Sequence, residues 1–232
     1  MNEISVTSHV GRDLLQSAQL FKTTEIAVWE YIVNSIQYVD PGTAAIINVD
    51  INHKAKTIII EDNARGMDIA GIQNYFKMHG ENIDRQSGRF GRGNFGTGKS
   101  AAFGIGNRLT VSSTCNNLRN TTSLHREEVE RSTGNSIPVE ILGRNTQVDN
   151  SRNGTLIKIE EIFIKKIDAS KIIKKIEKNL QAFRNVNPKV LVGDHICTYK
   201  EPDFYQANEY EPEGQLKEIL GDTKLLVKVA NT

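Results

Sequence analysis

The chain has 232 residues, with 29 Lys or Arg against 28 Asp or Glu, so its formal net charge of +1 argues against a broad nucleic-acid-binding surface. A hydrophobic content of 38% supplies one substantial core and excludes global disorder. No apolar run exceeds four residues, and Cys115 and Cys197 lack the spacing of a zinc site or a disulfide framework, so we expect a cytoplasmic protein with reduced thiols and no membrane partner.

The first part of the chain predicts two helices with a hairpin between them. Apolar residues recur at steps of three and four over residues 23–39, which indicates an amphipathic helix that ends at the Asp-Pro-Gly sequence of residues 40–42. The stripe consists of Ile26, Trp29, Val33 and Ile36. The β-branched runs 44–51 and 57–60 predict a hairpin, and residues 69–78 predict the second helix.

Residues 80–98 contain six glycines and few apolar side chains. A segment of this length and composition predicts a mobile functional loop, a lid. Beyond it we expect a helix over residues 168–184 and strands over residues 108–114, 120–124, 137–142, 155–160 and 190–198. Antiparallel strands segregated from the helices predict an α+β fold, a two-layer sandwich, rather than a parallel doubly wound sheet.

The sequence Gly93-Asn94-Phe95-Gly96-Thr97-Gly98-Lys99-Ser100 satisfies the P-loop pattern, whose amides, lysine and hydroxyl would bind phosphates and magnesium. A P-loop follows a buried strand, whereas the polar residues 84–89 precede this one. A P-loop NTPase is therefore the minor interpretation. Under either interpretation, exposed backbone N–H groups at the start of a short helix from Lys99 would favour the binding of an anion.

Three further features place polar groups where a ligand could meet them. Glu30 and Asn34 are one turn apart on the first predicted helix, so they share a face. Asp62 follows a strand and precedes a flexible turn that contains Gly66. The pair Gly154-Thr155 begins another strand. Taken singly, each feature is as typical of a solvent-facing stripe or an ordinary turn as of a site.

Taken together and in this order, the features resemble the GHKL ATPase superfamily of DNA gyrase B, the ninety-kilodalton heat-shock chaperone, sensor histidine kinases and MutL. The sequence that begins at Phe95 looks most like the chaperone branch. Among the branches of the superfamily, the chain is most similar to the chaperone and MutL branches. The family's Asp-x-Gly-x-Gly box is matched by Asp62 and Gly66, but Ala64 replaces the middle glycine. The resemblance implies a Bergerat-type ATP-binding fold, a mostly antiparallel sheet covered on one face by helices.

The resemblance also implies a role for each matched residue. Asp62 would accept a hydrogen bond from the adenine amine, supported by Thr155, and Asn34 would coordinate Mg²⁺. Glu30 would activate the attacking water, a role that separates hydrolysis from the histidine-kinase reaction. The implied nucleotide-binding residues are Asn34, Asp62, Gly66, Met67, Gly91, Gly93, Gly96, Thr97, Gly98, Lys99, Ser100 and Thr155.

The implied function is Mg²⁺-dependent ATP binding and hydrolysis with lid closure and ATP-dependent homodimerisation. Residues 1–22 would form a candidate dimerisation strap, residues 23–200 the ATP-binding domain, and residues 201–232 a linker and the start of a following domain. In the family a basic residue from that following domain completes the γ-phosphate site, so slow turnover is expected without it. A nucleotide-sensing module with little turnover is the alternative, and the client, protein or nucleic acid, is not identified.

Overall fold

The computed structural model describes residues 10–77, 98–132, 136–149, 152–201 and 204–230. The chain divides into two compact units, one reaching Thr198 and one covering Tyr199–Thr232, and each is described by itself. No helix in these ranges is long and apolar enough to cross a membrane. Cys115 and Cys197 are both free thiols, as predicted.

The first unit contains helices and strands in the order α1 (Val10–Ala18), α2 (Thr24–Gln37), β1 (Ile46–Asn52), β2 (Thr57–Asp62), α3 (Ile69–Phe76), the 3-10 helix η1 (Gly98–Gly104), β3 (Arg108–Cys115), β4 (Leu118–His125), α5 (Arg126–Arg131), β5 (Glu140–Gln147), β6 (Gly154–Glu160), α6 (Ala169–Asn179), the 3-10 helix η2 (Leu180–Phe183), β7 (Lys189–Val192) and β8 (His195–Cys197).

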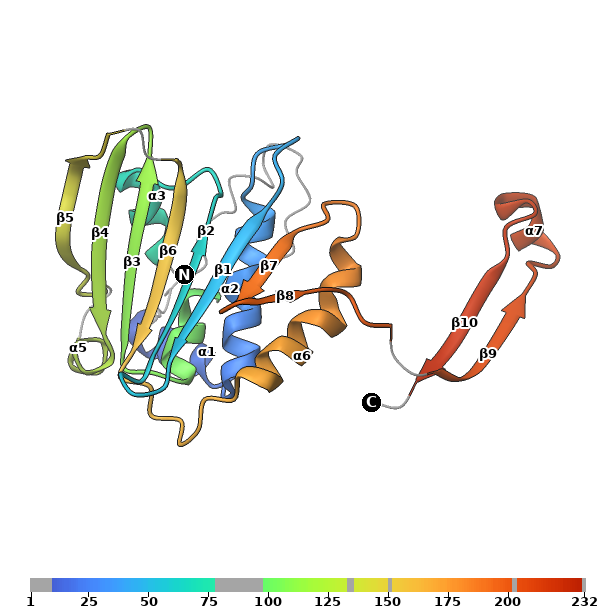
Figure 1. The fold of residues 1–232 in the computed structure, drawn as a ribbon, viewed down its shortest axis with the longest axis horizontal. Coiled ribbons are helices and arrows are strands. Elements are labelled where there is room, and N and C mark those ends of the chain that lie inside the picture. Colours follow the sequence, from blue (N-terminus) through green and yellow to red (C-terminus); the bar gives the residue numbers. More distant parts are fainter. Residues whose placement is uncertain (1–9, 78–97, 133–135, 150–151, 202–203, 231–232) are drawn as a thin grey trace, which may run out of the picture. The chain divides into compact units, whose positions relative to one another are not determined.

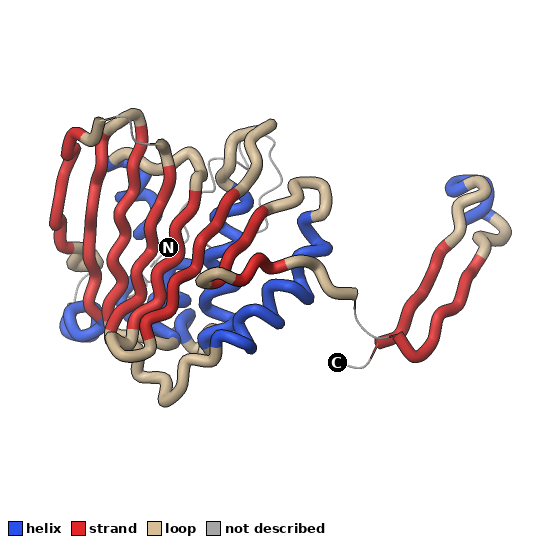
Figure 2. Tube along the Cα trace, viewed as in Figure 1, coloured by secondary structure: helices blue, strands red, loops and turns tan. Residues whose placement is uncertain are grey.

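Eight strands form one sheet in the order β5-β4-β3-β6-β2-β1-β7-β8, and every neighbouring pair is antiparallel except β1 with β7. Helices α1, α2 and α3 lie behind this sheet in Figures 1 and 2, and α6 packs against α2. Strand β1 alternates accordingly, because Ile47 and Val49 face the helices and are buried while Asn48 and Asp50 are exposed. The predicted α+β two-layer sandwich is confirmed.

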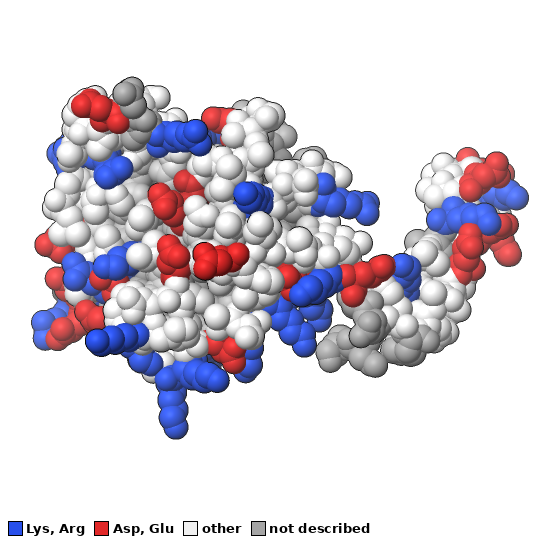
Figure 3. Space-filling model, viewed as in Figure 1, with Lys and Arg blue, Asp and Glu red and all other residues white. Residues whose placement is uncertain are grey.

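The open face of the sheet is polar. Thr110 of β3 donates to Glu160 of β6 at 2.9 Å, and Arg108 and Lys158 both form ion pairs with the same carboxylate. Figure 3 shows lysines, arginines and acidic residues interspersed on this face of the first unit, without a large area of one sign. This distribution agrees with the near-neutral net charge.

Helix α2 buries a face that only partly coincides with its predicted apolar stripe, since Ile36 is buried while Trp29 and Val33 are half-buried. Ile26 is 37% exposed, whereas Tyr31 is buried and Ser35 is only 5% exposed. The helix contacts β2, η1 and α6, so it is covered on several sides, and Trp29 meets Phe183 of η2 edge to face. A helix covered on several sides needs apolar groups around most of its surface, and periodicity alone then misplaces the buried face.

Other boundaries differ from the prediction. Helix α3 ends two residues early at Phe76, and the strand expected over residues 190–198 is two strands, because the chain turns at Gly193, where φ is +56°. The strand expected over residues 137–142 occupies Glu140–Gln147. Residues 10–21 contribute Leu14, Ala18 and Phe21 to the core.

The second unit is small. Strand β9 (Phe204–Tyr210) pairs antiparallel with β10 (Leu225–Ala230), and α7 (Gln215–Leu220) lies between them in the chain. Strands β9 and β10 lie within residues 201–232, the range expected to hold a linker and the start of a following domain. The backbone of β9 pairs with that of β10, and a pairing between separate segments is not indicated by amino-acid composition.

Candidate functional site

Helix α2 presents two of the predicted site residues to the start of η1. A Cβ atom added to Gly98 would lie 2.7 Å from Oε1 of Glu30 and 2.9 Å from Nδ2 of Asn34. The backbone at Gly98 therefore lies so close to both side chains that their ends would have to move to admit a larger residue. The structure brings Glu30, Asn34 and Gly98 together, as the motifs predicted.

Glu30 lies in a partly buried position, and burial raises the pKa of its carboxyl group. Across the described ranges, neither the Glu30 carboxylate nor the Asn34 amide has a side-chain hydrogen bond. A carboxyl group with a raised pKa suits a proton acceptor that works near neutral pH. The amide oxygen of Asn34 is one turn away on the same helix.

The carboxylate of Asp62, at the end of β2, is fixed by three hydrogen bonds. The Ser35 hydroxyl donates to Oδ2 at 2.6 Å, and the backbone N–H groups of Ala64 and Thr155 donate to Oδ1 at 3.0 and 2.9 Å. Burial raises the pKa of Asp62, and the three hydrogen bonds act in the opposite direction. A carboxylate has about four acceptor positions, so one on Oδ2 remains for a ligand.

Two positions in the turn after Asp62 differ in their need for glycine. Ala64, which stands where the family has its middle glycine, is 4% exposed and has no positive φ angle, so its side chain is accommodated. Gly66 has φ +71°, and a Cβ atom there would lie 1.9 Å from the carbonyl oxygen of Thr114. The turn passes directly over β3, and only glycine fits at this point.

Thr155 was expected to support the contact between Asp62 and adenine, and the structure places its backbone N–H on Oδ1 of Asp62. The Thr155 hydroxyl lies 2.9 Å from the hydroxyl of Ser113 on β3. The Ser113 oxygen also accepts a hydrogen bond from the Met67 N–H at 2.8 Å. Ser35 and Ser113 were not among the predicted site residues. Ser35 could have been found from its position directly after Asn34. Nothing in the serine and threonine run of β3 distinguishes Ser113.

Lys99 was predicted to add positive charge at the phosphates, and the structure places its ammonium group elsewhere. Nζ donates to the carbonyl oxygens of Tyr75, at 2.8 Å, and of Lys77, both at the end of α3. The residue is 6% exposed, and burial lowers the pKa of its side chain to about 8. The side chain of Ser100 is also buried.

A tyrosine joins α2 to η1 behind the site. The Tyr31 hydroxyl accepts the N–H of Ala102 at 3.1 Å and donates to the carbonyl oxygen of Lys99 at 3.2 Å. Burial raises the pKa of Tyr31 well above its ordinary value, so this hydroxyl stays protonated. These bonds hold the start of η1, and with it Gly98, at a fixed distance from α2.

The remaining predicted positions, Gly91, Gly93, Gly96 and Thr97, and the lid up to residue 97 lie outside the described residues. The P-loop interpretation is not supported, because a mostly antiparallel sheet replaces the parallel sheet of that fold and Lys99 bonds to α3. No cluster of three His, Cys, Asp or Glu residues suits a metal ion within the described segments.

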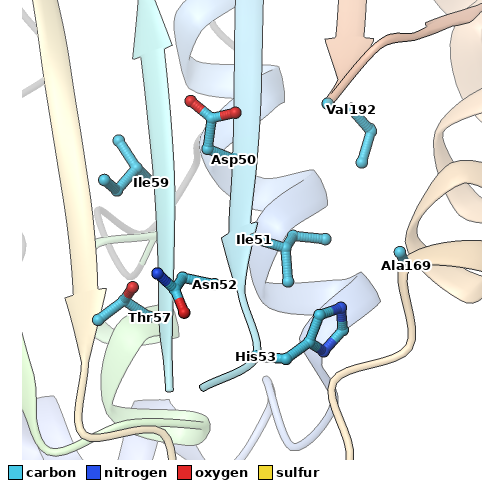
Figure 4. A pocket seen from close by; sticks show the side chains of 9 residues that line it. Asp50, Ile51, Asn52, His53, Thr57, Ile59, Ala169 and Val192 are labelled. Carbon is cyan, nitrogen blue, oxygen red and sulfur yellow. The ribbon is translucent and has the colours of Figure 1, made fainter. Parts of the chain in front are cut away.

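A pocket of about 450 Å³ lies away from these residues (Figure 4). It is lined by Asp50, Ile51, Asn52, His53, Thr57, Ile59, Ala169, Val192 and Gly193, from β1, β2, the start of α6 and the end of β7. None of the predicted nucleotide-binding residues is among them. The pocket is thus separate from the group formed by Glu30, Asn34, Asp62 and Thr155.

Comparison with known families agrees with the grouping of these residues. A family model described as "Histidine kinase-, DNA gyrase B-, and HSP90-like ATPase" matches residues 22–155, more than half of the chain. The matched range begins just before α2 and ends at Thr155, so it contains every residue placed around Asp62 and Glu30 above. No curated protein matches the chain.

Proposed function

The chain belongs to the histidine kinase-, DNA gyrase B- and HSP90-like ATPase family, and from this premise we propose that its first unit binds Mg·ATP between α2, the end of β2, η1 and the start of β6 and hydrolyses it. The observation that carries the proposal is the carboxylate of Asp62, half-buried and held by three hydrogen bonds with one acceptor position left. Its fold is the Bergerat fold of that family.

Base selectivity follows from the remaining acceptor position on Asp62. The exocyclic amine of adenine donates a hydrogen bond to it, whereas guanine presents a carbonyl oxygen at the same place and would leave two acceptors opposed. Ser35, Ala64 and Thr155 hold the carboxylate in one orientation, so it cannot turn away from the mismatch. The site therefore favours ATP over GTP.

Hydrolysis depends on the pair on α2. Asn34 fits Mg²⁺, because its amide oxygen is a hard ligand and Mg²⁺ commonly takes one or two protein groups beside phosphates and water. When bound, the ion would neutralise phosphate charge. Glu30 orients a water molecule and accepts its proton, a task for which the raised pKa suits it.

A nucleotide-sensing module with little turnover is the second candidate. It is favoured by the position of Lys99, whose ammonium bonds to α3 instead of adding charge beside Gly98. Phosphoryl transfer without a basic side chain at the transition state is slower by several powers of ten. A basic residue from a following domain would restore the rate, as would one from the lid proposed over residues 80–98. ATP-dependent homodimerisation is proposed on the same family grounds.

Calorimetric titration with Mg·ATP and Mg·GTP tests the adenine site. The unaltered protein should bind ATP and prefer it to GTP, and Asp62→Asn should lose roughly 1–3 kcal/mol of binding free energy, because its amide can present a donor to the adenine amine. Asp50→Asn, an exposed acid on the open face of β1, is the control and should bind normally. Undiminished affinity in Asp62→Asn would remove Asp62 from the nucleotide site.

A further inference from the structure

The side chain of Lys99 connects the first turn of η1 to the end of α3. Its Nζ atom donates hydrogen bonds to the backbone carbonyl oxygens of Tyr75, at 2.8 Å, and of Lys77, the residue that ends the helix. The last carbonyl groups of an α-helix have no partner within the helix, and a lysine side chain near them is also favoured by the helix dipole. Lys99 therefore caps α3 from positions 24 and 22 residues further along the chain than its two partners.

The backbone of the same residue is bound to α2. The Tyr31 hydroxyl donates to the carbonyl oxygen of Lys99 at 3.2 Å. Gly98, directly before Lys99, lies against the side chains of Glu30 and Asn34. The side chain of Lys99 thus holds η1 to α3, while its backbone holds η1 to α2.

Burial explains why the ammonium group of Lys99 keeps to these carbonyl groups. The residue is only 6% exposed, so the two carbonyl oxygens supply hydrogen bonds that water would otherwise make. An ammonium group has three N–H donors, and two of them are used within the protein.

We propose that Lys99 is a positioning residue for hydrolysis, which keeps Gly98 against Glu30 and Asn34 by fastening η1 to α3. The inference rests on the proposed function, because it concerns the same site. Without this fastening the first turn of η1 could move relative to α2, and a displacement of about 1 Å is enough to lower a rate about a hundredfold. In this role Lys99 acts through the backbone of η1, whereas a phosphate ligand would act through its own charge.

The test compares two lysines that make the same kind of contact. Lys56 also donates from Nζ to two carbonyl oxygens, those of Ile164 and Lys165, each at 3.1 Å, and none of these is a predicted site residue. Lys56→Met is thus a matched control for Lys99→Met, because both variants lose two hydrogen bonds from an ammonium group to the backbone. Lys99→Gln keeps N–H donors on a shorter, uncharged side chain, and it carries the comparison if Lys99→Met does not fold.

Denaturant unfolding, calorimetric titration with Mg·ATP and steady-state phosphate release are measured for the unaltered protein and the three variants. We expect Lys99→Met to lower turnover at saturating ATP about tenfold and to change the affinity for Mg·ATP less than about threefold. Lys56→Met should keep its turnover, and Lys99→Gln should lose less turnover than Lys99→Met. In a Glu30→Gln background, Lys99→Met should lower the remaining turnover less than about twofold, because the group that it positions is already absent.

Normal turnover in a folded Lys99→Met protein, or an equal loss in Lys56→Met, would overturn the role of Lys99. A loss of ATP affinity larger than the loss of turnover would make Lys99 a phosphate ligand and would also overturn it. The same is true of a full tenfold loss in the Glu30→Gln background, since Lys99 would then not act through Glu30. Failure of the unaltered protein to hydrolyse ATP would instead overturn the proposed function, on which this role depends.

Discussion

The two ends of the proposed nucleotide site are built in different ways. At the adenine end, Asp62, Thr155 and Ser113 are joined to one another or to neighbouring backbone by short hydrogen bonds. At the phosphate end, Glu30 and Asn34 are held close to Gly98 without a side-chain hydrogen bond in the described part of the chain. In the proposed site, the adenine end is thus held by hydrogen bonds within the protein, whereas the phosphate end is held by the close approach of α2 to Gly98.

Removing the proton acceptor at the phosphate end gives the largest expected effect. In Glu30→Gln the side chain keeps its shape but loses the basic oxygen, so hydrolysis should fall at least about a hundredfold while Mg·ATP binding is retained. Steady-state phosphate release and calorimetry measure the two quantities. Glu25→Gln, in the first turn of the same helix, is the control and should keep its rate. Normal turnover in Glu30→Gln would reject the mechanism.

A methyl group at the adenine end tests its rigidity. In Gly66→Ala the new Cβ would meet the backbone of Thr114, which cannot rotate away, and the residue would also be held at φ +71°. We expect the free energy of unfolding to fall by about 2 kcal/mol or more. Gly193→Ala is the matched control, with φ +56° but nothing within 4 Å of the new atom, so it carries the backbone strain alone. Equal denaturant midpoints for the two variants would mean that the turn is not tightly packed on β3.

The same methyl group at the phosphate end should act differently. In Gly98→Ala the new Cβ meets the far ends of the Glu30 and Asn34 side chains, which can rotate away at little cost. Stability should therefore change by less than about 1 kcal/mol, but hydrolysis should fall about tenfold because both groups leave their positions. Thermal unfolding and phosphate release distinguish the two effects. A variant that unfolds like Gly66→Ala would show that the phosphate end is as rigid as the adenine end.

The smallest expected effect is the pH dependence of stability that Lys99 confers. Its pKa is about 8 in the fold and 10.5 ordinarily, so the unfolded chain binds more protons between these values. The free energy of unfolding should therefore rise with pH through this window, by on the order of 1 kcal/mol up to pH of about 9.5. Denaturant unfolding at several pH values measures it, and Lys99→Met should lack the rise. The same slope in both proteins would place the titration elsewhere.

Sequence patterns were sufficient for the fold class and for most of the grouping in the site. The two-layer α+β sandwich follows from the separation of helical and antiparallel-strand patterns along the sequence. Glu30 and Asn34 lie together beside Gly98, and Asp62 and Thr155 are joined by a hydrogen bond. The direction of the Lys99 side chain could not be predicted, because its partners are carbonyl groups at the end of α3, whose position depends on tertiary packing. Ser113 was missed for a similar reason, since its partners come from two other segments of the chain.

Helix α2 carries a group for each end of the site, because Glu30 faces η1 and Ser35 holds Asp62. Five residues of α-helix separate them, which is about 7.5 Å along the axis. The separation between the two ends of the proposed site is thus set by one helix and does not depend on the conformation of a loop. We expect a nucleotide with a shorter phosphate chain to reach Asp62 but not Glu30, so the fixed length of α2 would make the proposed site sensitive to nucleotide length.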